Sequence, residues 1–125
     1  MNYQNWKVIV VEDTYDDMQV ASAILTHYGV EVHVAHNGME CLDLLDSISP
    51  TFIITDLAMP EMDGWEMLSQ IRDNATTSHI PVIAMTAYDS ANVGEDAYKA
   101  GFNAYFPKPL SPRHLIEHLT RVLGE

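Results

Sequence analysis

The segment Thr51–Trp65 (TFIITDLAMPEMDGW) constrains the fold most, because its most apolar part runs directly into a carboxylate. Phe52, Ile53 and Ile54 suit a strand that is covered on both faces of a sheet. Asp56 follows two residues later, and an ionised carboxylate is costly to bury without a partner. The segment therefore predicts a buried strand whose carboxyl end delivers Asp56 to a polar site.

Strand-like and helix-like segments alternate along the chain. The predicted strands are Lys7–Val11, Val30–His36, Phe52–Asp56, Val82–Thr86 and Ala104–Phe106. The predicted helices lie near Asp16–Tyr28, near Met39–Ser47, after Asp63, near Ala91–Ala100 and after Ser111. This alternation predicts an α/β fold, in which a five-stranded parallel sheet carries helices on both faces.

Strand composition predicts the order of the strands in this sheet. Lys7–Val11, Phe52–Asp56 and Val82–Thr86 are almost entirely apolar, as central strands should be. Val30–His36 alternates between apolar and polar residues, and Ala104–Phe106 is short, so both suit sheet edges. The order 2-1-3-4-5 of the flavodoxin-like (βα)₅ fold satisfies this arrangement.

Local signals give further expectations for three of the helices. The third helix opens with Asp63 and Glu66 at capping-box spacing. Gly94 interrupts the fourth helix, where glycine costs helix stability, so we expect this helix to move or to fray. The predicted apolar face of the first helix consists of Val20, Ala23, Ile24 and His27.

Polar side chains follow four of the predicted strands. In sheets of this order, ligands bind beyond the carboxyl ends of the strands, where the strand order reverses. These ends carry Glu12, Asp13, Asp56, Thr86 and Lys108. The sequence therefore predicts a crevice that contains crowded carboxylates, a hydroxyl group and an ammonium group.

The chemistry of this set points to phosphoryl transfer. Crowded carboxylates repel one another unless a cation joins them, and their hard oxygen atoms suit Mg²⁺, or Mn²⁺, better than Zn²⁺. Thr86 adds a hydroxyl donor, and Lys108 adds a point charge that suits a phosphoryl oxygen. A carboxylate nucleophile with these partners predicts that Asp56 accepts a phosphoryl group.

Composition excludes several classes of partner. The chain of 125 residues suits one domain, residues 1–125. A formal net charge of -12 disfavours nucleic acid and anionic membrane surfaces as partners.

Cys41 is the only cysteine, which excludes an internal disulfide, and its helical spacing with Leu44 and Leu45 indicates a core thiol. The sequence lacks a signal-type start, and we expect a cytoplasmic protein.

Four segments together carry a family resemblance. VIVVEDT, IITDLAMPEMDGWEML, IPVIAMTAY and AGFNAYFPKPLS resemble the receiver domain of two-component response regulators, in family order and over nearly the whole chain. The resemblance implies that Asp56 accepts its phosphoryl group from a histidine kinase or a phosphotransfer protein. It implies a signalling switch that catalyses only its own phosphorylation and dephosphorylation, rather than an enzyme acting on other molecules.

The resemblance also assigns the metal and phosphate ligands. Asp13, Asp56 and the backbone carbonyl of Ala58 would hold Mg²⁺, with Glu12 assisting through water. Lys108 would bind the phosphoryl group, and the peptide bond between Lys108 and the following proline would be cis.

Four further positions are implied to respond to the phosphoryl group or to tune it. Thr86 would turn toward that group, and Tyr105 would swing inward with it. Ala58 and Tyr88 occupy positions that set how long the aspartyl phosphate survives. We expect a long-lived phosphoryl state, because Ala58 cannot position an attacking water and Tyr88 can shield the phosphate.

The resemblance extends to partners. The family signals through the face of the fourth helix, fifth strand and fifth helix, so we expect a downstream protein there, and a monomer or a phosphorylation-dependent dimer. The sequence stops at Glu125, directly after the fifth helix, so we expect the domain to act without an attached output domain, unless the chain is cut from a larger regulator. Asp16 and Asp17 open the first helix near the site, either as a docking surface for the kinase or as a solvated helix start.

Three other functions compete with the switch. A magnesium-dependent phosphatase of the haloacid dehalogenase type carries the motif Asp-x-Asp, in which the first Asp is the nucleophile. In this chain Ala58 stands at the position of the second Asp, so the acid–base partner is missing. A flavin or nucleotide carrier needs a phosphate-cradling loop after the first strand, where EDTYDD places four acids. A receiver-like module that binds proteins without phosphorylation stays open, although the expected site residues are present.

Overall fold

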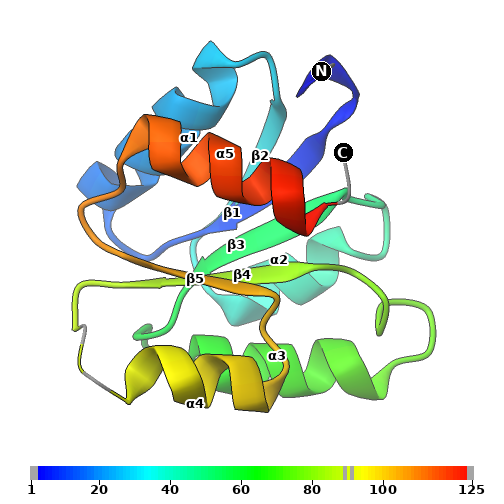
Figure 1. The fold of residues 1–125 in the computed structure, drawn as a ribbon. Helices are drawn as coiled ribbons and strands as arrows, with labels where there is room; N and C mark the ends of the chain where they lie inside the picture. Colours follow the sequence, from blue (N-terminus) through cyan, green and yellow to red (C-terminus); the bar gives the residue numbers. More distant parts are fainter. Residues whose placement is uncertain (1–2, 89, 91, 124–125) are drawn as a thin grey trace.

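The structure is a computed structural model that describes residues 3–88, 90 and 92–123 (Figure 1). Its strands form a parallel sheet in the order β2-β1-β3-β4-β5, which confirms the predicted order. The strands are β1 (Lys7–Val11), β2 (Glu31–Ala35), β3 (Phe52–Asp56), β4 (Val82–Thr86) and β5 (Ala104–Pro107). The helices are the 3-10 turn η1 (Tyr3–Asn5), α1 (Tyr15–His27), α2 (Gly38–Leu44), α3 (Gly64–Asp73), α4 (Val93–Ala100) and α5 (Pro112–Val122). Ala91, where the fourth helix was predicted to begin, lies outside the described residues.

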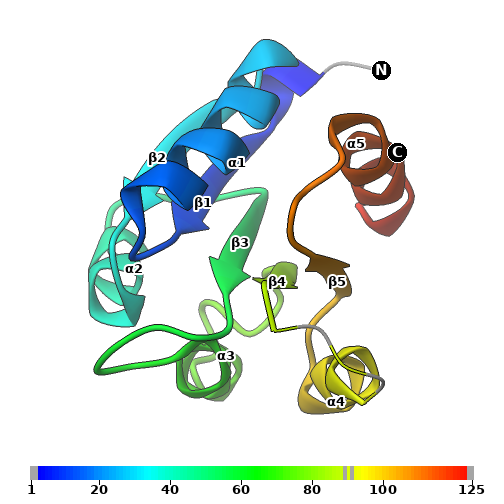
Figure 2. The ribbon, with the colours of Figure 1, turned by 90° about the vertical axis from the view of Figure 1, so that its left-hand side faces the viewer.

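Helices cover both faces of the sheet, as predicted (Figures 1 and 2). One core lies between the sheet and α1 with α5, and a second lies between the sheet and α2, α3 and α4. Cys41 of α2 is fully buried in the second core, and burial raises the pKa of its thiol to about 12, which confirms a core thiol. In the described part of the chain, every helix is too short or too polar to cross a membrane.

Local chemistry fixes the loop that follows β3. Asp63 Oδ1 accepts a hydrogen bond from the backbone N–H of Glu66 at 2.9 Å, as the capping-box spacing predicted, and this bond starts α3. The loop is therefore held at one end by the sheet and at the other by a capped helix. This arrangement limits how far the backbone beside Asp56 can move.

The predicted apolar face of α1 is wrong for three of its four residues, whereas Ile24 is partly buried and packs against the core. Met18, Ala21 and Leu25 point into the core, whereas Val20 is 48% exposed and Ala23 and His27 are also exposed. Both sets of residues have helical spacing, so the sequence pattern alone could not separate them. Which of the two sets faces the core depends on the direction in which α1 leaves β1 and crosses the sheet.

Gly94 lies in the first turn of α4 rather than in its middle, because the described helix begins at Val93. A Cβ atom at Gly94 would lie 3.2 Å from Cδ2 of Tyr105, which is closer than ring and Cβ carbons normally approach. Glycine therefore leaves room for the Tyr105 ring against α4. The residue has a packing role in addition to its helix-weakening effect.

The corrected face of α1 predicts unequal effects of two alanine substitutions. Leu25→Ala should lower the free energy of unfolding by about 2–5 kcal/mol, because it leaves a cavity in the core. Val20→Ala should change it by about 0.5 kcal/mol or less, because this side chain is half exposed. Urea denaturation followed by circular dichroism measures both, and equal losses would contradict the assignment.

Candidate functional site

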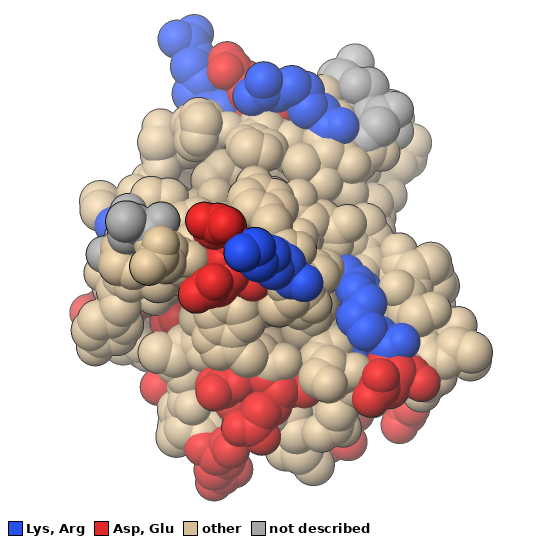
Figure 3. Space-filling view, turned by 60° about the horizontal axis from the view of Figure 1, so that its bottom comes forward, with Lys and Arg blue, Asp and Glu red and all other residues tan. Residues whose placement is uncertain are grey.

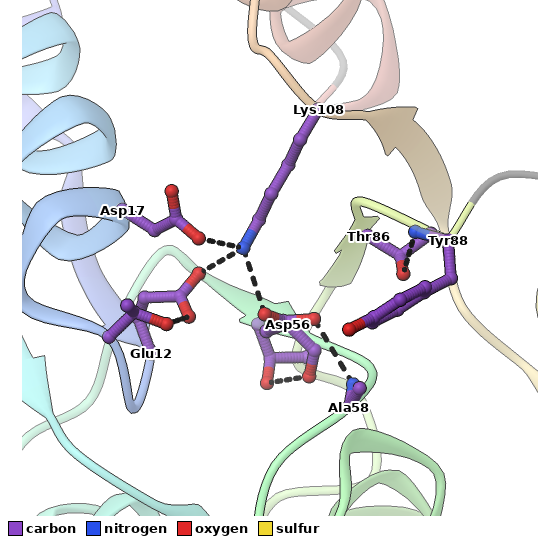
Figure 4. A network of polar contacts seen from close by, with 9 residues as sticks. Glu12, Asp17, Asp56, Ala58, Thr86, Tyr88 and Lys108 are labelled. Carbon is purple, nitrogen blue, oxygen red and sulfur yellow. Dashed lines mark hydrogen bonds and ion pairs between the residues drawn. The ribbon is translucent and has the colours of Figure 1, made fainter.

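The carboxyl ends of β1, β3, β4 and β5 meet at one edge of the sheet, and their side chains form the candidate site (Figure 4). The strand register pairs Asp56 with Met85, and it pairs Thr86 with Pro107, directly before Lys108. Glu12 follows β1 and is fully buried. Sheet pairing therefore brings together groups that are as much as 96 residues apart in the sequence.

Lys108 is the cation at the centre of the site (Figure 4). Its Nζ lies 2.6 Å from Glu12 Oε2, 2.8 Å from Asp17 Oδ2 and 2.8 Å from Asp56 Oδ2. An ammonium group has three N–H donors, so these contacts engage all of them. Because the Lys108 side chain is only 11% exposed, water competes little for these donors.

Burial and charge act in opposite directions on the pKa values of this site. Burial raises the pKa of Glu12 to about 7, against the opposing effect of its hydrogen bond from Lys108. Burial alone would lower the pKa of Lys108, but its hydrogen bonds to Asp17, Asp56 and Glu12 outweigh burial and raise it. Lys108 therefore stays charged at neutral pH, whereas burial favours the protonated form of Glu12.

Glu12, Asp13 and Asp56 form an acidic cluster that fits a divalent cation. Each offers one carboxylate oxygen, and these oxygens lie within 4.8 Å of one another. Asp13 is exposed, whereas the other two are buried, so the cluster opens to solvent on one side. A single ammonium group cannot balance these carboxylates, and the hard oxygen donors match the ligands that Mg²⁺ and Mn²⁺ prefer.

The loop after β3 holds the second oxygen of Asp56. The backbone N–H of Ala58 donates to Asp56 Oδ1 at 3.1 Å. Gly64 makes this tight loop fit, because a Cβ atom there would lie 2.6 Å from the carbonyl oxygen of Asp56. With Lys108 on Oδ2 and Ala58 on Oδ1, the orientation of the Asp56 carboxylate is set from both sides.

An open cavity of about 540 Å³ leads to this edge of the sheet, and its walls include Asp13, Ala58, Trp65, Thr86 and Tyr88. The backbone N–H of Tyr88 donates to Thr86 Oγ1 at 3.0 Å. The Tyr88 ring extends from this turn toward the loop that carries Ala58 (Figure 4). Tyr88 is 76% exposed, so it borders the cavity without closing it.

Tyr105 lies away from this constellation, on β5, where it is partly buried and packs with the core beneath α4. The predicted cis peptide bond between Lys108 and Pro109 is present. The structure thus gathers the predicted carboxylates, Thr86 and Lys108 at one edge, and it places the Tyr105 ring against Gly94 of α4.

Sequence reasoning missed Asp17 as a member of the site. Its carboxylate binds Lys108 (Figure 4), although the sequence suggested only a docking surface or a solvated helix start. Asp17 lies four residues after Asp13, within the first turn of α1. Because helical side chains tilt toward the helix N-terminus, that position points back to the strand end. This spacing was the available signal.

The pKa of Glu12 predicts a pH dependence of stability in the metal-free protein. The folded-state pKa of about 7 lies above the ordinary value of 4.5. The protonated carboxyl therefore favours the folded state, and its contribution is present below about pH 4.5 and lost as the pH rises through 7. Relative to Glu12→Gln, the wild type should lose free energy of unfolding between pH 5 and pH 8. Urea denaturation in the presence of a chelator measures this difference, and a constant difference would contradict the prediction.

Comparison with known proteins identifies the family. The model of the response regulator receiver domain matches residues 8–120. The polar-differentiation response regulator DivK of Brucella anthropi is 34% identical over 118 residues, which cover 94% of this chain and 96% of that protein. The chemotaxis response regulator CheY4 of Vibrio cholerae has a TM-score of 0.84 at 29% identity, covering 94% of this chain and 98% of that one.

A third relative bears on the acidic cluster. The receiver domain of the sensor histidine kinase PA1611 of Pseudomonas aeruginosa was solved with a magnesium ion in its active-site cleft. Its TM-score is 0.86 at 27% identity, covering 96% of this chain and 98% of that one. The matched segment 8–120 includes all the strand ends that build the candidate site. The chain belongs to the response regulator receiver domain family of two-component signalling.

Proposed function

We propose that this receiver domain is switched by phosphorylation of Asp56, with a phosphohistidine of a histidine kinase or a phosphotransfer protein as donor. The observation that supports the proposal best is the position of Asp56. It ends the central strand β3 with one oxygen bonded to the Lys108 ammonium, next to Thr86 and beside an open cavity. A carboxylate, a lysine and a hydroxyl group together supply the nucleophile and the donors to phosphoryl oxygens that phosphoryl transfer requires.

The transfer is a displacement at phosphorus. An oxygen of the Asp56 carboxylate attacks, the new O–P bond forms, and the P–N bond of the phosphohistidine breaks with its electron pair going to the imidazole nitrogen. Lys108 holds a positive charge beside the attacking oxygen and can shift its N–H to an oxygen of the transferred group. The attacking group is a carboxylate and not a hydroxyl, so the step requires no general base.

Asp13, Asp56 and the carbonyl of Ala58 would hold Mg²⁺, with Glu12 assisting through water. The ion would supply positive charge that offsets the charge of the transferring phosphoryl group. The excess of carboxylates over cations in the acidic cluster supports this role, and Mn²⁺ would fit the same oxygen donors.

Thr86 and Tyr105 would carry the signal from the site to α4. Thr86 is almost fully buried, and its hydroxyl oxygen accepts the N–H of Tyr88. A turn of Thr86 toward a phosphoryl oxygen would break this bond and move the start of the connection from β4 to α4. Tyr105, which lies against Gly94, would then swing into the space that Thr86 vacates.

The face formed by α4, β5 and α5 would bind the downstream protein. Acidic groups outnumber basic ones on the side of the molecule that Figure 3 brings forward, in keeping with 18 Asp and Glu against six Lys and Arg. The helices of the face itself are balanced in charge: α4 and α5 carry three acidic residues, Glu95, Asp96 and Glu117, and three basic ones, Lys99, Arg113 and Arg121. The domain would bind its partner as a monomer or as a phosphorylation-dependent dimer.

Intact mass spectrometry tests the acceptor. Incubation with Mg²⁺ and acetyl phosphate should add one phosphoryl group to the wild type and none to Asp56→Asn, because the amide is not a nucleophile. Chelation of the metal should abolish the gain. No gain in the wild type, under conditions where Mg²⁺ binds, would favour the phosphorylation-independent binding module instead.

The lifetime of the phosphoryl group tests the roles of Ala58 and Tyr88. Ala58 presents only a methyl group, and both residues border the cavity through which water would reach Asp56. The double variant Ala58→Asn, Tyr88→Glu should hydrolyse its aspartyl phosphate roughly tenfold faster, because polar groups can position the attacking water. Loss of the phosphoryl mass after removal of the donor gives the rate. A wild-type half-life no longer than that of the variant would refute the shielding role.

A further inference from the structure

Asp17 is the third carboxylate on Lys108, and it comes from outside the strand ends. It lies in the first turn of α1, and its Oδ2 is 2.8 Å from the lysine Nζ. Its side chain is 43% exposed, whereas those of Glu12 and Asp56 are 0% and 9% exposed. Water can therefore solvate Asp17, and it keeps its charge at lower cost than the two buried carboxylates.

The other two carboxylates that accept from Lys108, those of Glu12 and Asp56, also take part in a second set of interactions. Glu12 and Asp56 belong to the acidic cluster with Asp13, which fits a divalent cation. Asp56 is also the proposed acceptor, and its carboxylate becomes an acyl phosphate during the reaction. Asp17 is not a member of this cluster. When a cation and a phosphoryl group bind Glu12 and Asp56, Asp17 remains the carboxylate that contacts Lys108 alone.

We propose that Asp17 is a positioning residue, which holds the Lys108 ammonium beside Asp56 while the phosphoryl group is transferred. The inference rests on the proposed phosphorylation of Asp56 and adds a residue to that reaction. Lysine is a point charge on a flexible stem, so its position is set by its partners. Asp17 is carried by α1 and holds the ammonium on a different side from Asp56 (Figure 4).

The walls around the lysine stem support this role. A small cavity of about 70 Å³ lies between α1 and the connection from β5 to α5, and it is lined by Asp17, Val20, Met85, Lys108, Pro109 and Leu110. Without the Asp17 contact, the stem would have space to lean into this cavity. The ammonium would then leave the position from which it reaches a phosphoryl oxygen on Asp56.

A competing account gives the opposite prediction. Asp17 adds a negative charge near the entrance of an anionic donor, and if repulsion were its main effect, its removal would speed phosphorylation. Asp16 provides a matched control, since it is exposed, carries the same charge and lies in the same helical turn. Asp16→Asn reports the general charge effect.

The decisive experiment measures phosphorylation by acetyl phosphate at saturating Mg²⁺ for four proteins. Relative to the wild type, Asp17→Ala should slow the reaction by about three- to tenfold, because one charge-assisted hydrogen bond is lost. Asp17→Asn keeps an acceptor oxygen, so its phosphorylation rate should lie between those of the wild type and Asp17→Ala. Asp16→Asn should stay within about twofold of the wild type, as expected for an exposed charge. A faster or unchanged rate in Asp17→Ala would overturn the proposal.

A second measurement needs neither metal nor donor. In metal-free protein, Asp17→Asn should lower the urea midpoint in the wild-type background but not in the Lys108→Met background, because the contact requires both partners. An equal shift in both backgrounds would overturn the contact and the proposal with it. Failure of the proposed function is distinguishable, because then no protein, including the wild type, gains a phosphoryl group, and the inference falls together with the function.

Discussion

One ammonium group surrounded by carboxylates is the interaction on which the candidate site depends. Lys108 bonds to Glu12, Asp17 and Asp56, and Asp13 adds a further charge beside them. Without the lysine, the buried pair Glu12 and Asp56 would lack their cationic contact and repel each other. With it, the site still carries excess negative charge, so it remains ready to accept a divalent cation.

The fold holds these carboxylates close together despite their mutual repulsion. The pairing of β1 with β3 and of β3 with β4 fixes the strand ends relative to one another. Two apolar cores, one on each face, hold the sheet in place. At Gly64 the backbone comes so close to the strand end that no side chain fits. The acidic groups are therefore held together by the stability of the whole α/β domain and not by their own attraction.

Much of the fold could be predicted from the sequence, because apolar runs of strand length are clear when a strand is buried on both faces. β1, β3 and β4 have their predicted bounds, and the strand order is confirmed. The apolar face of α1 was wrong except for Ile24, because two sets of residues share helical spacing and only the tertiary packing of α1 on the sheet selects one. The position of Gly94 was read as a weakness, whereas the contact with Tyr105 explains it.

The site was predictable to the extent that topology alone brings strand ends together. Asp17 was not found, because it belongs to α1 and not to a strand end, so its contact with Lys108 depends on where α1 begins. The roles of Ala58, Thr86, Tyr88 and Tyr105 remain predictions, since they concern a phosphorylated state.

A crystal structure with Mg²⁺ and beryllium fluoride, which mimics a phosphoryl group, would test the central claim most directly. The account predicts the metal on Asp13, Asp56 and the carbonyl of Ala58, and the fluoride group on Asp56 in contact with Lys108 and the Thr86 hydroxyl. An unmodified Asp56, or a metal bound away from the acidic cluster, would contradict it.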